Sequence, residues 1–155
     1  MMPTPAAVAR PAVIGWKNPL HEMTQTTPTC LWNDSASAEE LRQSIEFGAV
    51  GATCNPVIAL AVLTAEMPSW RPRIQTLISE LPTATEDELG WRVVEEMSIK
   101  AATILRPIFE AHQGRNGRLS IQTDPRLYRD SAAILQQAQR FSDLAPNMIV
   151  KIPAT

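Results

Sequence analysis

Apolar and polar positions follow two different periods along this chain, and the two alternate. Short apolar runs lie at residues 27–34, 49–56, 118–125 and 147–153, each with the length of a buried strand. The stretches between them repeat apolar residues every three or four positions, which is typical of helices that bury one face. The sequence therefore predicts an α/β fold whose fourth strand comes last, with helices packed outside a parallel sheet.

Two of the predicted helices begin with a capping signature. Ser37 is followed three residues later by Glu40, and Thr85 by Glu88, a spacing in which each side chain can bond the backbone N–H of the other. The second signature opens the longest predicted helix, over about residues 86–112. Other helices are predicted over residues 57–66, which are apolar nearly all round and expected to be buried, over about 70–81, and over about 130–144.

The number of predicted strand–helix units fits half of a closed barrel. A (β/α)8 barrel needs roughly 250 residues, and this chain has 155. We expect residues 29–155 to form the first four βα units of such a TIM barrel, after a flexible, Ala- and Pro-rich leader at residues 1–28. A half-barrel leaves unpaired strand edges and an uncovered inner face, so the chain is expected to be an N-terminal fragment or a truncated gene product.

Composition and charge argue against several classes of function. The net charge of −2 and the pI near 5.7 disfavour a nucleic-acid surface, which needs a basic stripe. No run approaches the roughly 18 apolar residues of a membrane span. Prolines in the leader interrupt the apolar run that a signal peptide would need. A cytoplasmic location is therefore predicted. Cys30 and Cys54 lack the spacing of metal ligands, and neither His21 nor His112 has a paired ligand, so no metal is expected.

Polar side chains gather where the predicted strands end. In barrels of this kind the carboxyl ends of the strands face the active site, and these positions hold Asp34, Thr53, Asn55, Gln122, Asp124 and Lys151. Most of them also have a plainer explanation. Asp34 and Asp124 can cap the helical segments that follow, Asn55 can be a turn residue, and Gln122 can bond backbone groups. Residue type alone leaves both readings open.

Lys151 is the most informative of these residues, because it lies in an apolar strand expected to be buried on both faces. A buried ammonium group costs several kcal/mol unless it is paired, although a lysine at a strand edge can extend to solvent. A pKa lowered from about 10.4 to about 7 leaves half of the amine neutral at pH 7. A neutral amine attacks carbonyl carbons and forms a Schiff base, which accepts electrons when a C–C bond breaks. Glycine-rich phosphate loops and a Ser-His-Asp arrangement are not evident, so the candidate chemistry rests on Lys151.

Four segments resemble those of the transaldolase family, in the family's order. GATCNPVIA is similar to the family's GxTTNPS segment, and SIQTDPRLYRD to its third-strand signature. APNMIVKIPAT resembles the segment that carries the Schiff-base lysine, and LWNDSAS the first strand with its catalytic aspartate. The resemblance covers residues 29–155. It implies transfer of a dihydroxyacetone unit between sugar phosphates in the pentose phosphate pathway, without metal or organic cofactor.

The resemblance also implies a role for each candidate residue. Lys151 is the Schiff-base nucleophile, and Asp34 is the acid/base that takes the hydroxyl proton as the C–C bond breaks. Asn55 and Thr53 position substrate hydroxyls and the catalytic water. The family's remaining strands supply an asparagine, a serine and an arginine-rich phosphate pocket that this sequence does not contain, so little activity is expected of this chain alone.

The chain departs from the transaldolase pattern at Gln122, where a glutamate usually relays protons through water. Glutamine holds water by hydrogen bonds but does not exchange a proton at neutral pH, and the related fructose-6-phosphate aldolases also have glutamine there. The long helical stretch between the second and third strands favours a transaldolase, because the short aldolases lack most of it. Reversible aldol cleavage stays as one alternative, and a non-catalytic half-barrel that forms homo-oligomers through its open edges stays as another.

Overall fold

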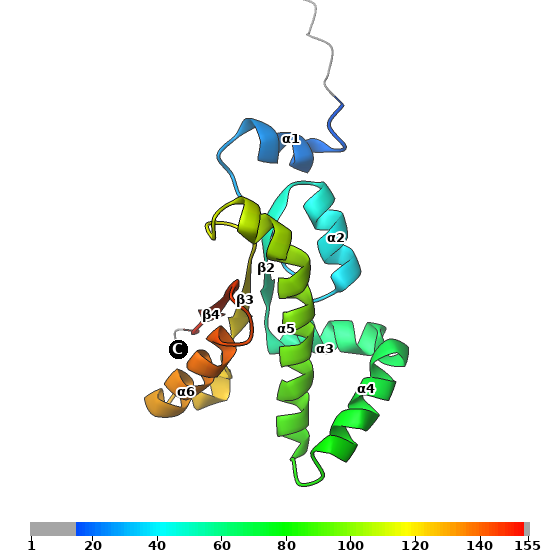
Figure 1. Cartoon of the computed structure of the whole chain (residues 1–155), viewed down its shortest axis with the longest axis vertical. Coiled ribbons are helices and arrows are strands. Elements are labelled where there is room, and N and C mark those ends of the chain that lie inside the picture. Colours follow the sequence, from blue (N-terminus) through cyan, green and yellow to red (C-terminus); the bar gives the residue numbers. More distant parts are fainter. Residues whose placement is uncertain (1–14, 154–155) are drawn as a thin grey trace, which may run out of the picture.

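Four parallel strands form one sheet in the computed structural model, which describes residues 15–153. The strands are β1 (Leu31–Asn33), β2 (Ala49–Cys54), β3 (Arg118–Gln122) and β4 (Met148–Lys151), and they lie side by side in chain order (Figure 1). Each neighbouring pair is parallel. The α/β fold with the first βα units of a TIM barrel, predicted from the sequence, is therefore confirmed.

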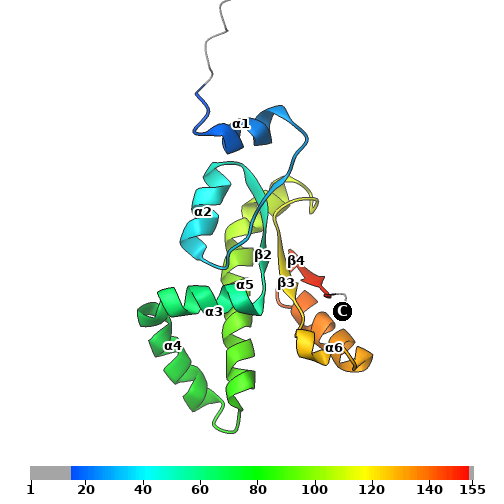
Figure 2. The ribbon, with the colours of Figure 1, turned by 180° about the vertical axis from the view of Figure 1, so that it is seen from behind.

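The connections between the strands are helical. The α-helices are α1 (Pro19–Thr26), α2 (Ala38–Glu46), α3 (Pro56–Ala65), α4 (Met67–Glu80), α5 (Glu86–Ala111) and α6 (Ser131–Ser142), and a short 3-10 turn, η1, spans Pro125–Leu127. Of these, α1 and η1 are additions to the predicted set, and the other helices agree with it to within a few residues. Seen from behind, β2 and β3 lie in front of α5 (Figure 2).

Helix α1 lies within the segment that the sequence predicts to be a flexible leader. Asn18 caps the helix by accepting a hydrogen bond from the His21 N–H (2.8 Å), and a proline occupies its first turn, where no N–H is needed. The Thr24 hydroxyl donates to the Phe47 carbonyl (3.2 Å), which ties the helix to the end of α2. Residues 1–14 of the leader lie outside the described residues.

The main core lies between the sheet and α5. Leu119 and Ile121 of β3 are fully buried, and they belong to one apolar cluster with Met97 and Leu105 of α5. The residues that alternate with them on β3, Ser120 and Gln122, are only half-buried. Because successive side chains of a strand point to opposite faces, the polar set belongs to the face of the sheet turned away from α5.

Helix α3 is less buried than the sequence predicts. Its apolar residues were expected to be buried, but only Ala59 is, whereas Val57 is 78% exposed and Leu60 is 63% exposed. A helix that is apolar all round gives no amphipathic signal of which side faces the core. Burial then depends on which elements pack on it, and here α4 and α5 contact it.

The two predicted capping signatures have different outcomes. At α5 both halves form, because the Thr85 hydroxyl accepts from the Glu88 N–H (3.3 Å) and the Glu88 carboxylate accepts from the Thr85 N–H (2.7 Å). At α2 the Ser37 hydroxyl accepts from the Glu40 N–H at 3.5 Å and donates to the Glu66 carboxylate at 3.0 Å. Ser37 therefore caps α2 as predicted. Its hydroxyl bonds to the Glu66 carboxylate, and the expected bond between the Glu40 side chain and the Ser37 N–H does not form.

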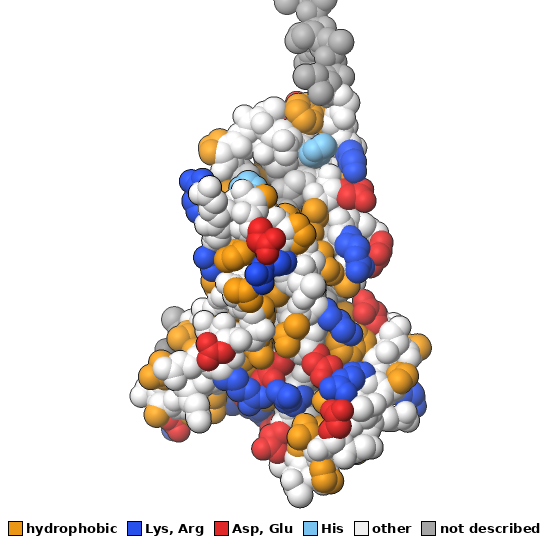
Figure 3. All heavy atoms as spheres, viewed as in Figure 1, with side chains coloured by type: hydrophobic (Ala, Val, Ile, Leu, Met, Phe, Trp, Pro, Cys, Tyr) orange, Lys and Arg blue, Asp and Glu red, His pale blue; other side chains and the backbone are white. Residues whose placement is uncertain are grey.

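Ion pairs join the helices outside the sheet. Glu95 of α5 has only 2% of its side chain exposed and lies between Arg92 (2.8 Å) and Arg140 of α6 (2.6 Å). Arg73 of α4 similarly reaches Glu96 of α5 (2.7 Å). Basic and acidic side chains are accordingly interspersed over this face of the molecule (Figure 3).

A buried asparagine fixes the start of β4. The Asn147 side chain is 1% exposed, and its Nδ2 donates to the carbonyls of Ala102 and Gly117, each at 2.8 Å. Gly117 has a φ of +73°, and a Cβ there would lie 2.1 Å from the Phe109 backbone nitrogen. The asparagine thus links α5, the residue before β3 and the first residue of β4.

Candidate active site

The carboxyl ends of the strands surround an open cavity of about 370 Å3. Among the residues predicted from the sequence, Asp34, Thr53, Asn55 and Lys151 line it. Gln122 is not part of its lining, but it is paired in register with Lys151 on the adjacent strand. Segments more than a hundred positions apart in the chain are therefore brought to one edge of the sheet.

Asp34 and Thr53 are in direct contact across the ends of β1 and β2. The Thr53 hydroxyl donates a hydrogen bond to Oδ1 of Asp34. The register of the two strands, in which Asn33 pairs with Ala52, places the residues that follow them side by side. The contact uses Oδ1, and within residues 15–153 the second oxygen, Oδ2, makes no hydrogen bond to protein.

Asn55 ends β2 and begins α3. Its Oδ1 accepts from the N–H groups of Val57 (2.9 Å) and Ile58 (3.0 Å), so it caps the helix. The capping bonds use the carbonyl oxygen of the side chain. Within residues 15–153 the Nδ2 group makes no hydrogen bond to protein and can donate to a ligand in the cavity.

Lys151 is exposed, which corrects the expectation that its strand is buried on both faces. In β4 only Met148 is buried, and Ile152, just after the strand, is 55% exposed. The inner face of a four-stranded sheet has no second half-barrel over it among the described residues, so side chains on this face reach solvent. Among the ion pairs of residues 15–153, none involves the Lys151 ammonium group.

Comparison with known proteins identifies the family. The family model for transaldolase/fructose-6-phosphate aldolase matches residues 31–155. The chain belongs to this family. It is 35% identical to a transaldolase of Kocuria rhizophila over 146 residues, which is 84% of this chain and 39% of that protein. It is 31% identical to a transaldolase of Thermobifida fusca over 147 residues, 89% of this chain and 39% of that protein.

A third relative gives the same result over a shorter stretch. Transaldolase 1 of Streptomyces coelicolor is 36% identical over 109 residues, 68% of this chain and 28% of that protein. This member of the transaldolase/fructose-6-phosphate aldolase family thus spans less than half the length of the curated relatives it matches.

Asp124, also predicted at a strand end, lies away from this cavity. It caps η1 and accepts hydrogen bonds from Nε (3.0 Å) and Nη2 (2.7 Å) of Arg126. The guanidinium of Arg126 holds the pKa of the Asp124 carboxyl below its usual value. Of the two interpretations of Asp124, active-site residue or helix cap, the structure therefore supports the helix cap.

Trp32 and Ser120 also line the cavity, and the sequence reasoning missed both. Trp32 packs flat over Gly51, where an added Cβ would lie 2.5 Å from the indole ring. The available signal was the two-residue period of strands. Counting back two positions from Asp34 and from Gln122 gives these residues on the same face.

Two features of residues 15–153 bear on metal binding and on membrane insertion. In the described part of the chain, no three His, Cys, Asp or Glu residues are grouped so that they could hold a metal ion. None of the described helices is both long and apolar enough to cross a bilayer.

Proposed function

We propose that this chain carries the nucleophile half of a transaldolase active site, with Lys151 forming a Schiff base. The observation that carries the proposal is the shared cavity of Lys151, Asp34, Asn55 and Thr53 at the carboxyl ends of the strands, the end at which barrels of this class do their chemistry. Membership of the family supports the same assignment. The proposed substrates are sugar phosphates of the pentose phosphate pathway.

The proposed reaction begins at the lysine. Neutral Nζ of Lys151 bonds to the ketone carbon of the donor sugar, and the carbonyl oxygen leaves as water, giving an imine. With the imine nitrogen protonated, Asp34 takes the proton of the donor's C4 hydroxyl, the C3–C4 bond breaks, and its electron pair moves into the protonated imine to give an enamine. An aldehyde leaves. The enamine carbon then attacks the carbonyl of an acceptor aldose, and Asp34 returns its proton to the oxygen of that carbonyl. Hydrolysis of the new imine releases the product and regenerates Lys151.

The other cavity residues have supporting roles in this proposal. Thr53 donates to Oδ1 of Asp34, which directs the remaining oxygen at the reacting hydroxyl. Asn55 offers Nδ2 to a substrate hydroxyl, because its oxygen already caps α3. Gln122, beside Lys151 in register, holds the water exchanged during imine formation.

Because the chain spans 39% of the relatives' length, we expect weak turnover from it alone. A cytoplasmic location and homo-oligomers stay predictions.

Trapping with dihydroxyacetone and borohydride tests the nucleophile without a phosphate pocket. The lysines of the chain are Lys17, Lys100 and Lys151, so two serve as internal controls. Lys17 pairs with Glu46 (2.9 Å) and Lys100 lies 3.8 Å over the Trp70 ring. We expect the reduced three-carbon adduct on the peptide that contains Lys151, measured by mass spectrometry. Equal labelling of all three lysines would contradict the assignment.

Reversible aldol cleavage is the second candidate, and Gln122 favours it. An amide holds water but does not relay a proton at neutral pH, whereas the transaldolase pattern has glutamate at this position. The two functions differ in whether an acceptor is needed. An aldolase releases glyceraldehyde 3-phosphate from fructose 6-phosphate without an added aldose, which a coupled dehydrogenase assay detects. Release that depends on an added aldose phosphate supports the transaldolase, and Gln122→Glu should shift the balance toward transfer.

A further inference from the structure

Trp32 gives the candidate active site an apolar wall that the proposed chemistry does not use. It lies on β1 two positions before Asp34, so both side chains belong to the same face of the sheet, and both line the same cavity. Among the described residues that line the cavity, Trp32 is the one large apolar side chain. The others are Cys54 and the polar residues Asn33, Asp34, Thr53, Asn55, Ser120 and Lys151. An apolar wall together with several hydrogen-bonding groups suits a ligand that has both kinds of surface.

Gly51 of β2 makes room for the indole. A Cβ on Gly51 would lie 2.5 Å from Cε2 and 2.6 Å from Cδ2 of Trp32, so a larger residue would displace the ring. The backbone does not require glycine there, because the glycines with a positive φ in residues 15–153 are Gly48, Gly114 and Gly117. A glycine inside a strand often marks the close approach of another group. One face of the half-buried ring thus lies on the strand, and its other face is left to the cavity.

The pairing of β1 with β2 is irregular at this position. Leu31 pairs with Ala49 and Trp32 pairs with Gly51, so Val50 pairs with no residue of β1. An extra residue of this kind re-aims the neighbouring side chain, and such irregularities are common beside active sites. The shift in register brings the glycine opposite the indole, and the glycine lets the indole lie on the strand.

We propose that Trp32 binds the donor sugar, with the open face of its ring stacked on C–H groups of the donor's carbon chain. Sugars carry hydrogen-bonding hydroxyls and also apolar C–H groups, whose weakly positive hydrogens are attracted to the negative face of an aromatic ring. Stacking also removes apolar surface from water. With its chain against the indole, the donor presents its carbonyl carbon to Lys151 and its hydroxyls to Asp34 and Asn55. This inference rests on the proposed function and deepens it, since it names a binding determinant for the donor.

The concentration dependence of adduct formation on Lys151 tests the proposal. The chain is incubated with increasing dihydroxyacetone and with cyanoborohydride, which reduces imines faster than ketones, and the labelling rate is measured by mass spectrometry. In Trp32→Leu the half-saturating concentration should rise about three- to tenfold, because the flat ring face is lost. The maximal rate should stay unchanged, which is the pattern for a lost binding contact. Trp32→Phe keeps an aromatic face and should have a smaller effect. A purely structural role would lower the maximal labelling through a smaller folded fraction and leave the half-saturating concentration unchanged.

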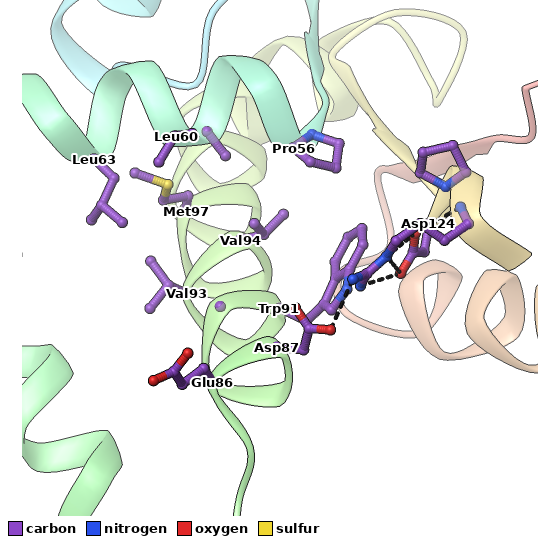
Figure 4. Close-up of a pocket in the computed structure, with 14 residues that line it drawn as sticks. Pro56, Leu60, Leu63, Glu86, Asp87, Trp91, Val93, Val94, Met97 and Asp124 are labelled. Carbon is purple, nitrogen blue, oxygen red and sulfur yellow. Dashed lines mark hydrogen bonds and ion pairs between the residues drawn. The ribbon is translucent and has the colours of Figure 1, made fainter.

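Two further variants locate the effect. Gly51→Ala leaves the indole in the chain but pushes it off the strand, so it should also raise the half-saturating concentration. Trp91→Phe is the matched control. Trp91 lines an apolar cavity between α3 and α5 (Figure 4), which shares no lining residue with the candidate active site, so this variant should label like the original chain. Urea unfolding curves check that each variant folds.

The indole N–H signals in NMR spectra give a second measurement, which does not depend on imine formation. The Trp32 signal is identified by its loss in Trp32→Phe. Dihydroxyacetone should shift this signal and leave that of Trp91 in place, and a shift should persist in Lys151→Arg, which forms no imine. A shifted Trp32 signal without any adduct on Lys151 would contradict the Schiff-base assignment and support the role of Trp32. An unmoved Trp32 signal, equal shifts of Trp32 and Trp91, or an unchanged half-saturating concentration in a folded Trp32→Leu chain would each overturn the proposal.

Discussion

Lys151→Arg is expected to remove the dihydroxyacetone adduct from this chain and leave the fold intact. A guanidinium has a pKa above about 12 and no free lone pair, so it keeps the charge of lysine but forms no imine. Lys151 is exposed at the end of β4, and a surface substitution of this kind changes stability by only about 0.5 kcal/mol. Mass spectrometry after borohydride reduction should find labelling reduced to the background of Lys17 and Lys100.

Lys100→Arg is the matched control for that experiment. Lys100 contacts the face of the Trp70 ring, and an arginine preserves that contact, so the variant should label as strongly as the original chain. A Lys151→Arg protein that folds and gains as much three-carbon adduct as the original chain would place the nucleophile elsewhere and remove the basis of the Schiff-base proposal.

The order of the elements and the gathering of the site could be predicted from the sequence, because both depend on local patterns. Short apolar runs separated by helical spacing fix which segments are strands. In a parallel sheet all strands end at the same edge, so a polar residue at each end, such as Asp34, Asn55 or Lys151, meets the others without any knowledge of side-chain contacts. The capping box at Thr85 is equally local.

Burial was the part that the sequence did not reveal, because it depends on partners distant in the chain. Val57 and Lys151 were both expected to be buried from the apolar residues around them, and both are exposed. An apolar run indicates that a segment packs in the core, but it does not show which face of the segment another element covers. Helix α1 was missed for a similar reason, since its contact is with the Phe47 carbonyl.

Asn147 is the clearest example of such a distant dependence, and Asn147→Ala should strongly destabilise the fold. Its two acceptors, the carbonyls of Ala102 and Gly117, lie 45 and 30 positions earlier in the chain. The Ala102 carbonyl lies inside α5 and keeps its helical N–H partner, so each lost hydrogen bond is expected to cost about 0.5–1.5 kcal/mol. The two together predict a loss of about 1–3 kcal/mol in the free energy of unfolding, measured by urea denaturation. That is a large share of the roughly 5–15 kcal/mol of a typical domain.

Two comparison variants separate the buried hydrogen bonds from a general effect of losing an asparagine. Asn116→Ala removes only an exposed contact with His112 (3.3 Å) and should cost less than about 1 kcal/mol. Asn147→Asp keeps the shape but turns an acceptor oxygen toward the two carbonyls, so it should destabilise at least as much as alanine. Because β4 begins at the next residue, Met148, amide exchange in β4 should rise together with the loss of stability. A cost below about 1 kcal/mol for Asn147→Ala would mean that β4, and with it Lys151, is held by the strand pairing alone.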